Sequence, residues 1–258
     1  MNPIAHHVIC RLADSRVIAP TPGERRLVAR VLLEKCRGRQ LLAFNLVDTH
    51  LHGEIAESRA CCGELVRRFE LALHHALCLE VGFGQPEIRP VKDQRHLFNA
   101  FDYILRQSDH HGLDWDPCLE ASNLPDLLGA RVLGIYSAGS VRRYLPRVRR
   151  QDLLATLGLS RLEEADGPLE DVVPAALAAA GLAEIRSRSA EGVTLARAIV
   201  EVVGDRMPVG RLADLLGVNR STLFRLRQRP VDQVLIRAVR LQLALRRPRP
   251  SVGNVCAA

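Results

Sequence analysis

The chain has 258 residues, of which 47% are hydrophobic and 25% are charged, and its formal net charge is +7. This composition is typical of a globular protein with a substantial core and excludes a disordered chain. No apolar run approaches the roughly 20 residues that a membrane span needs. The first residues, MNPIAHHVIC, lack the basic start and apolar stretch of a signal peptide. We therefore expect a cytoplasmic protein with no membrane partner.

The seven cysteines form no CxxC pair and show no zinc-like spacing. An odd number of scattered cysteines in an intracellular chain indicates reduced and mostly buried thiols. Cys61 and Cys62 precede His74 and His75, but all four fall in one expected helix, where adjacent side chains point in different directions. We expect no metal there.

Charge and histidine are unevenly distributed along the chain. Residues 186–249 contain 14 arginines and five acidic residues, a balance of +9, so the remainder carries about −2. All nine histidines lie at or before His111. A basic C-terminal part indicates a polyanionic partner, and any side-chain chemistry is expected in the first half.

The first 115 residues alternate between strand and helix patterns. Thr21 and Glu24 form a predicted capping box, and Asp93 is a predicted N-cap. In order, we expect a strand over 6–13, a helix from Thr21 to about 36–38, two strands within 40–56, a helix over 59–79, a strand over 87–91 and a helix over 94–108. The order β-α-β-β-α-β-α predicts an α+β fold, a ferredoxin-like antiparallel sheet covered by helices, as the domain 1–115.

The rest of the chain reads as helical. We expect a helical connector over 116–185, an all-α domain over 186–247 and a disordered tail over 248–258. The connector contains five arginines between Arg142 and Arg150. They are expected either to contact phosphate or to form a solvated helix face, and the pattern favours neither.

Two histidines mark the predicted strand before the second long helix. His50 and His52 flank Leu51, so both imidazoles should point to one face of the sheet. Neutral imidazoles side by side can hold a divalent metal. About fifty residues later, Tyr103 lies off the apolar face of its predicted helix, within a polar stripe of His96, Asn99, Tyr103, Gln107 and His110.

The combination of a His-apolar-His strand with a helix carrying Tyr103 and, four residues later, Gln107 resembles the single-tyrosine HUH transposases. In overall layout the chain is most similar to the REP-associated tyrosine transposases. The stretch IRPVKDQRHLFNAFDYILRQ is also similar in kind to the segment that leads into the tyrosine helix of that family. The resemblance covers about residues 5–115.

The resemblance implies specific roles. His50 and His52 would be ligands of Mg²⁺ or Mn²⁺, Gln107 the third protein ligand, and Tyr103 the nucleophile that cuts single-stranded or hairpin DNA. Glu54 shares the strand face of the two histidines and is a rival third ligand. The chain departs from the family before the first histidine, where Leu46-Val47-Asp48-Thr49 replaces Met-Pro-Asn, which puts the turn geometry in question. It also carries Gln107-Ser108 where Asn-Pro is common.

The C-terminal pattern predicts a helix-turn-helix that binds duplex DNA. Ala213 is small where two helices would cross, and Gly217 suits the tight turn. The second helix would then expose hydrogen-bonding and cationic groups, which are Arg220, Ser221, Thr222, Arg225 and Arg227. From Ser189 to Leu226 the chain also resembles the DNA-binding domain of the bacterial replication initiator DnaA, through the arginine-bearing first helix LARAI.

Three functions fit these features. The first is an active metal-dependent transposase that cleaves and rejoins single-stranded DNA through a 5′-phosphotyrosine, as a monomer or a homodimer near the bacterial nucleoid. The second is an inactive or domesticated HUH protein that regulates by binding DNA. The third, an HUH nickase of replication or conjugation, would often carry paired tyrosines or a helicase region, and neither is visible.

Overall fold

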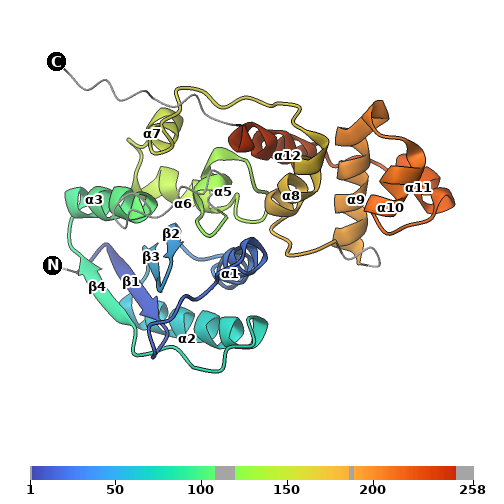
Figure 1. Ribbon diagram of the computed structural model, residues 1–258. Helices are drawn as coiled ribbons and strands as arrows, with labels where there is room; N and C mark the ends of the chain where they lie inside the picture. The colour runs from blue at the N-terminus through green and yellow to red at the C-terminus, as the bar shows by residue number, and fades with distance from the viewer. Residues whose placement is uncertain (1, 108–119, 186–188, 248–258) are drawn as a thin grey trace, which may run out of the picture.

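The computed structural model describes residues 2–107, 120–185 and 189–247. Four antiparallel strands form one sheet, and helices cover both of its faces (Figure 1), so the predicted α+β class is confirmed. The strands are β1 (Ala5–Arg11), β2 (Leu41–Val47), β3 (His50–Ile55) and β4 (Glu87–Val91), in the spatial order β2-β3-β1-β4. The central position of β1 brings residues far apart in the sequence into register with β3.

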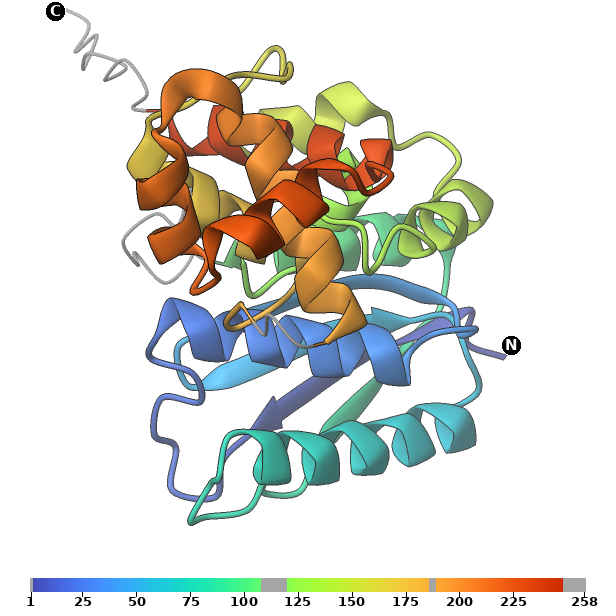
Figure 2. The ribbon, with the colours of Figure 1, turned by 90° about the vertical axis from the view of Figure 1, so that its right-hand side faces the viewer.

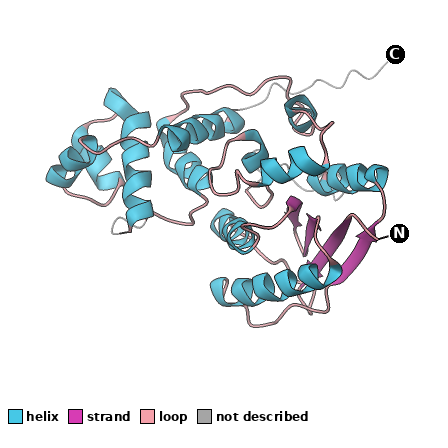
Figure 3. Cartoon of the chain, turned by 180° about the vertical axis from the view of Figure 1, so that it is seen from behind, coloured by secondary structure: helices cyan, strands magenta, loops and turns pink. Residues whose placement is uncertain are grey.

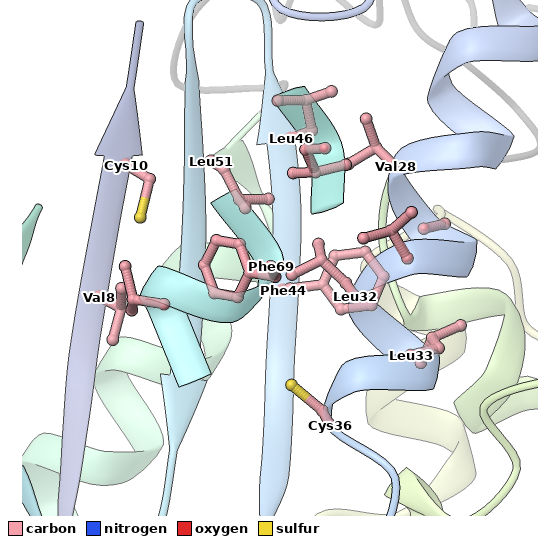
Figure 4. Packing of buried hydrophobic residues seen from close by; sticks show 14 of the residues in the cluster. Val8, Cys10, Val28, Leu32, Leu33, Cys36, Phe44, Leu46, Leu51 and Phe69 are labelled. Atoms are coloured by element: carbon pink, nitrogen blue, oxygen red, sulfur yellow. The ribbon is translucent and has the colours of Figure 1, made fainter. Parts of the chain in front are cut away.

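Two long helices cover one face of the sheet. Helix α1 (Pro22–Lys35) begins at Thr21, whose hydroxyl accepts from the backbone N–H of Glu24 in the expected capping box. Helix α2 (Arg59–Ala76) begins at Ser58. Alternate strand residues, such as Val8 and Leu51, pack against apolar side chains of these helices, such as Leu32 and Phe69 (Figure 4). Burial of this apolar surface holds the helices on the sheet.

The edge strand β2 is covered by chain from the connector. The backbone N–H of Phe44 donates to Oδ1 of Asn123, and Nδ2 of Asn123 donates to the carbonyl of Leu42, both at 2.9 Å. Leu46 also donates through its backbone to Ala121. These hydrogen bonds satisfy backbone N–H and C=O groups of the edge strand, which could otherwise pair with a strand of another chain.

The opposite face of the sheet packs against α3 (Gln94–Leu105) and part of the connector. The connector helices on this side are α5 (Leu124–Leu128), α6 (Ser137–Tyr144) and α7 (Arg150–Ala155). Leu97, Phe101 and Ile104 of α3 share one core with apolar residues of β2 and of these helices. Helix α3 ends at Leu105, with Arg106 as its C-cap, so the helix predicted over 94–108 is broken at Arg106; Gln107 is again helical, and Ser108 lies outside the described residues.

A third core, beside the two on the faces of the sheet, is built mainly from helices. Its helices are α8 (Leu169–Ala180), α9 (Ala190–Val203), α10 (Val209–Leu215), α11 (Arg220–Arg227) and α12 (Gln233–Arg246), with a 3₁₀ turn at Gly204–Arg206. Leu241 and Leu245 of α12 belong to the core with α3, whereas Leu235 and Val239 belong to the core with α9. Helix α12 therefore joins this core to the core around α3. Helices α9–α11 project away from the sheet (Figure 3) and lie nearest the viewer in Figure 2.

Other expectations can be compared with the fold. The five described cysteines are free, and Cys10, Cys36 and Cys62 are buried, as predicted, while Cys78 is exposed. Among the described helices, none has the length and apolar character needed to cross a membrane. The predicted tail over 248–258 and the end of the polar stripe at His110 lie outside the described residues.

Candidate active site

Helix α3 is held on the sheet face opposite α1 and α2 by its N-cap, by its apolar side and by a hydrogen bond from one buried amide. The side chain of Asp93 accepts from the backbone N–H of His96 at 2.8 Å and starts the helix. Near the other end, Nδ2 of the buried Asn45 in β2 donates to the carbonyl of Ile104 at 3.1 Å. This bond ties the last turn of α3 to the sheet and sets the position of the neighbouring Tyr103.

Tyr103 lies against His52, which in turn lies beside His50 on β3. The rings of His50 and His52 lie with centroids 4.7 Å apart, and the ring of Tyr103 lies edge-on to His52 at 5.9 Å. Tyr103 is 41% exposed, whereas His52 is buried and His50 is half-buried. A phosphate group can therefore approach the phenol from solvent while the imidazoles lie behind it. The sequence predicted this grouping, and the geometry brings these three residues together.

The turn at Asp48 and Thr49 leads into β3 and leaves both histidines on the sheet face that carries α3. Asp48 has φ +46°, a left-handed conformation that aspartate tolerates better than most residues. Val47 then pairs directly with His50 across the hairpin. The hydroxyl of Thr49 lies 3.2 Å from Nδ1 of His50.

A third histidine, His7, belongs to this group and was missed in the sequence. Nε2 of His7 in β1 lies 3.0 Å from Nδ1 of His52, and its ring is 6.2 Å from that of Tyr103. Burial, with smaller contributions from Arg89 and His96, lowers the pKa of His7 to about 4. A neutral His7 can accept a hydrogen bond from Nδ1 of His52, which orients that ring and directs its Nε2 toward a ligand.

The two expected third ligands occupy different environments. Gln107 is buried just after α3, and its Nε2 donates to the carbonyl of Tyr103 at 3.4 Å. Glu54 is fully buried, and burial raises its pKa well above the usual value. Within the described residues, neither carboxylate oxygen of Glu54 has a hydrogen-bond partner. Burial of this kind disfavours the charged form of a carboxyl group that has no cation beside it.

The donor set can be tested against a divalent metal. The ring separation of His50 and His52 allows both to reach one ion, and His7 supplies the type of outer contact that orients a ligating imidazole. Across the described parts of the chain, no three His, Cys, Asp or Glu side chains form a metal-binding group. Glu54 therefore forms no such group with His50 and His52. Gln107 would supply an amide oxygen, which is not one of these four side-chain types.

The residues predicted to bind DNA lie on α11, at the other end of the molecule from α3, the helix that contains Tyr103 (Figure 1). Helix α11 begins at Asn219, whose side chain accepts from the backbone N–H of Thr222 at 2.8 Å. Gly217, with φ +61°, makes the turn from α10. Leu223 and Leu226 are buried beneath the helix. Arg220, Ser221 and Arg225 are exposed, and Thr222 and Arg227 are half-buried.

Arg197, in the segment LARAI, has an internal role in this chain. Arg197 of α9 is buried, and its Nε donates to the carbonyl of Arg229 at 2.9 Å. Its Nη1 donates to the carboxylate of Glu201, also at 2.9 Å. Arg197 therefore holds the end of α11 against α9 and is not available to phosphate.

Comparison of the chain with models of known protein families, with curated protein sequences and with solved structures found no match.

Proposed function

We propose that this protein is a metal-dependent tyrosine DNA transposase of the HUH type, with a ferredoxin-like catalytic domain and a C-terminal helix-turn-helix. The observation that carries the proposal is the packing of Tyr103 against His52, whose ring in turn lies beside that of His50 on the same strand. A tyrosine from a helix and paired histidines from a strand are far apart in sequence, and only the fold unites them.

The chain's own groups account for the nucleophilic step. Oη of Tyr103 attacks phosphorus in a single-stranded DNA backbone, the new Oη–P bond forms, and the bond from phosphorus to the 3′ oxygen breaks. The phenol loses its proton, and the leaving 3′ oxygen takes one up. The product is a 5′-phosphotyrosine and a free 3′-hydroxyl. Because the ester retains the energy of the original bond, a 3′-hydroxyl can later attack it and rejoin the strand.

His50, His52 and Gln107 would hold Mg²⁺ or Mn²⁺, which supplies Lewis-acid stabilisation of the phosphate charge when bound. His7 would fix the orientation of His52, and the anchoring of α3 by Asn45 would hold Tyr103 over the phosphate. The exposed side of Tyr103 suits a single strand or the unpaired part of a hairpin, because a backbone inside a duplex is less accessible to such a site.

Helices α10 and α11 would form the helix-turn-helix that holds duplex DNA. Its proposed contacts are Arg220, Ser221, Thr222, Arg225 and Arg227, with Phe224 beside them at 56% exposed. The separation between α11 and α3 would let one molecule hold duplex DNA at one end and cut a single strand at the other. We place this activity in the bacterial cytoplasm, at the nucleoid, and it is compatible with a monomer or a homodimer.

The direct test is incubation with single-stranded oligonucleotides from the flanks of the gene, with Mg²⁺ or Mn²⁺, followed by a denaturing gel. We expect a protein–DNA adduct that EDTA, His50→Ala or Tyr103→Phe abolishes. Tyr136→Phe is the matched control, because the hydroxyl of Tyr136 donates to the carbonyl of Leu33 in the core and lies away from the histidines. Adduct formation by Tyr103→Phe would overturn the role of Tyr103.

A DNA-binding regulator is the second candidate. The observation that favours it is the cationic surface of α11, which is complete without any contribution from the tyrosine site. A regulator would bind duplex DNA with unchanged affinity after Tyr103→Phe and form no adduct with any flanking strand.

A further inference from the structure

A groove separates the first half of α3 from the segment that joins α6 to α7. It encloses about 960 Å³ and is lined by Arg95, Phe98, Arg143, Tyr144, Arg147 and Asp152, among others. In Figure 1 these elements lie at the same end of the molecule, with α6 and α7 beside α3. Nε2 of Gln94 donates to the carbonyl of Tyr144 at 2.6 Å, which fixes one wall against the other.

The charge of the groove favours an anion. Arg95, Arg143 and Arg147 make neither an ion pair nor a hydrogen bond with any described residue. Asp152 is the acidic residue of the lining, and its carboxylate already accepts from the backbone N–H of Arg149 at 2.7 Å. The lining thus contains three arginines that lack acidic partners and one aspartate, Asp152, that is engaged in capping α7. This excess of positive charge is complementary to a chain of phosphates.

The aromatic groups of the groove distinguish a nucleic acid from other polyanions. Phe98 is 46% exposed although it belongs to a helix with a well-filled core beneath it. The guanidinium carbon of Arg143 lies 5.5 Å from the centre of the Tyr144 ring. Aromatic faces alternating with guanidinium groups match the bases and phosphates of a single strand, whose bases are free to stack. An acidic peptide would use the cations but would have no need of the exposed ring.

We propose that this groove binds the single-stranded DNA that extends from the cleavage site at Tyr103, with bases stacked on Phe98 and Tyr144 and phosphates on Arg95 and Arg147. This inference rests on the proposed function. Arg95 and Tyr103 are eight residues apart on one helix, which is about 12 Å. At roughly 3.4 Å per stacked nucleotide, the strand reaches the groove about three to four nucleotides from the cut. His96 and Asn99, both exposed, lie on α3 between the two ends.

The test measures binding without catalysis. The parent is the full chain carrying Tyr103→Phe, Arg220→Ala and Arg225→Ala, so that neither the nucleophile nor α11 contributes, and no metal is added. Binding of a 12-nucleotide fluorescein-labelled single strand is followed by anisotropy over a range of salt concentrations. We expect Phe98→Ala to weaken binding about 5- to 100-fold, the range for loss of one stacked base. Arg95→Ala with Arg147→Ala should reduce the salt slope by about 1.4, or 0.7 for each lost phosphate contact.

Matched controls carry the same changes elsewhere. Leu71→Ala removes another exposed apolar side chain, from α2, and Arg37→Ala with Arg39→Ala removes two exposed cations near the end of α1. Both controls should bind as the parent does. If the groove variants bound the strand as tightly as the parent, or if the controls lost as much affinity, the groove would not be a binding site for single-stranded DNA. Because the parent has no nucleophile, an adduct in the wild type combined with unaffected groove variants would reject the groove alone. Absence of the adduct combined with weakened groove variants would reject the cleavage chemistry alone.

Discussion

The half-buried His7 contacts the buried His52 and is expected to set the orientation of its ring. A neutral His7 accepting from Nδ1 of His52 would direct Nε2 of His52 to a metal. We predict that His7→Ala lowers Mn²⁺ affinity about 10- to 100-fold, the usual cost of losing an outer contact to a ligating histidine. Isothermal titration measures this directly.

His7→Gln is the matched variant for this prediction. The amide oxygen of glutamine can accept the same hydrogen bond, so part of the affinity should return. Equal Mn²⁺ affinity in the wild type and in His7→Ala would show that His7 has no positioning role.

Glu70 provides a pH-dependent test of stability away from the site. Burial raises its pKa to about 7, partly offset by a hydrogen bond with Cys10. The folded state therefore keeps a proton that the unfolded chain releases near pH 4.5, and stability falls as pH rises from about 4.5 to 7. Glu70→Gln should raise the free energy of unfolding at pH 8 by about 1–2 kcal/mol, because the carboxyl retains part of its hydration and the full shift is not realised.

Denaturant unfolding of both proteins at pH 4.5 and pH 8 checks this prediction. The difference should be small at pH 4.5 and clear at pH 8. A difference that is the same at both values would contradict the raised pKa.

At the scale of residues, the sequence predicted His50, His52 and Tyr103 because each belongs to a recognisable local pattern. His7 has no such pattern, since His6-His7 in a strand gives no sign of its neighbour. Only the pairing of β1 with β3, which places His7 opposite Glu54 and close to His52, brings it to the site. A contact of this kind depends on strand register, which a single sequence determines weakly.

The elements themselves were more predictable than their contacts. Thr21, Asp93 and Asn219 cap helices α1, α3 and α11 through their side chains, and the first two were expected from local sequence. The strand over 87–91 was predicted with its observed bounds. The helix predicted over 94–108 is interrupted at Arg106, the C-cap of α3, and the polar residues Arg106 and Gln107 carry no local signal that marks this break.

The surface of α11 gives a prediction for a whole element. Arg220→Ala with Arg225→Ala should weaken duplex DNA binding and reduce the salt slope by about 2, because each lost phosphate contact accounts for about 0.9. Arg37→Ala with Arg39→Ala has the same change in charge and should leave the slope unaltered. Anisotropy with labelled duplex DNA at several salt concentrations measures both. A flat salt response in the wild type would remove the DNA-binding role of α11.

Across the whole molecule, the connector takes part in all three cores. Helices α5–α7 pack with α3 and the sheet, while α8 packs with α9 and α12. The sequence did not indicate this division, because the connector's helices are short and their partners lie far away in the chain. The buried Glu120 links helices of different cores: its carboxylate accepts from Arg26 of α1 at 2.8 Å and from Arg246 of α12 at 2.9 Å.

Glu120→Gln should therefore destabilise the whole protein. Removing the carboxylate leaves Arg26 and Arg246 without this charge partner, and loss of one member of a buried ion pair costs about 3–5 kcal/mol. Glu163→Gln is the control, because its pair with Arg161 is exposed and should contribute less than about 1 kcal/mol. Urea unfolding measures both, and equal effects would contradict a structural role for Glu120.

The role of Tyr103 as the nucleophile is tested by locating the covalent bond between protein and DNA. The wild-type protein is incubated with Mn²⁺ and a single-stranded flank, the adduct is digested with protease and nuclease, and the modified peptide is sequenced by mass spectrometry. The account predicts a nucleotide linked through its 5′ phosphate to Tyr103. A nucleotide on Tyr136 or Tyr144, or no modified peptide with any flanking strand, would contradict it.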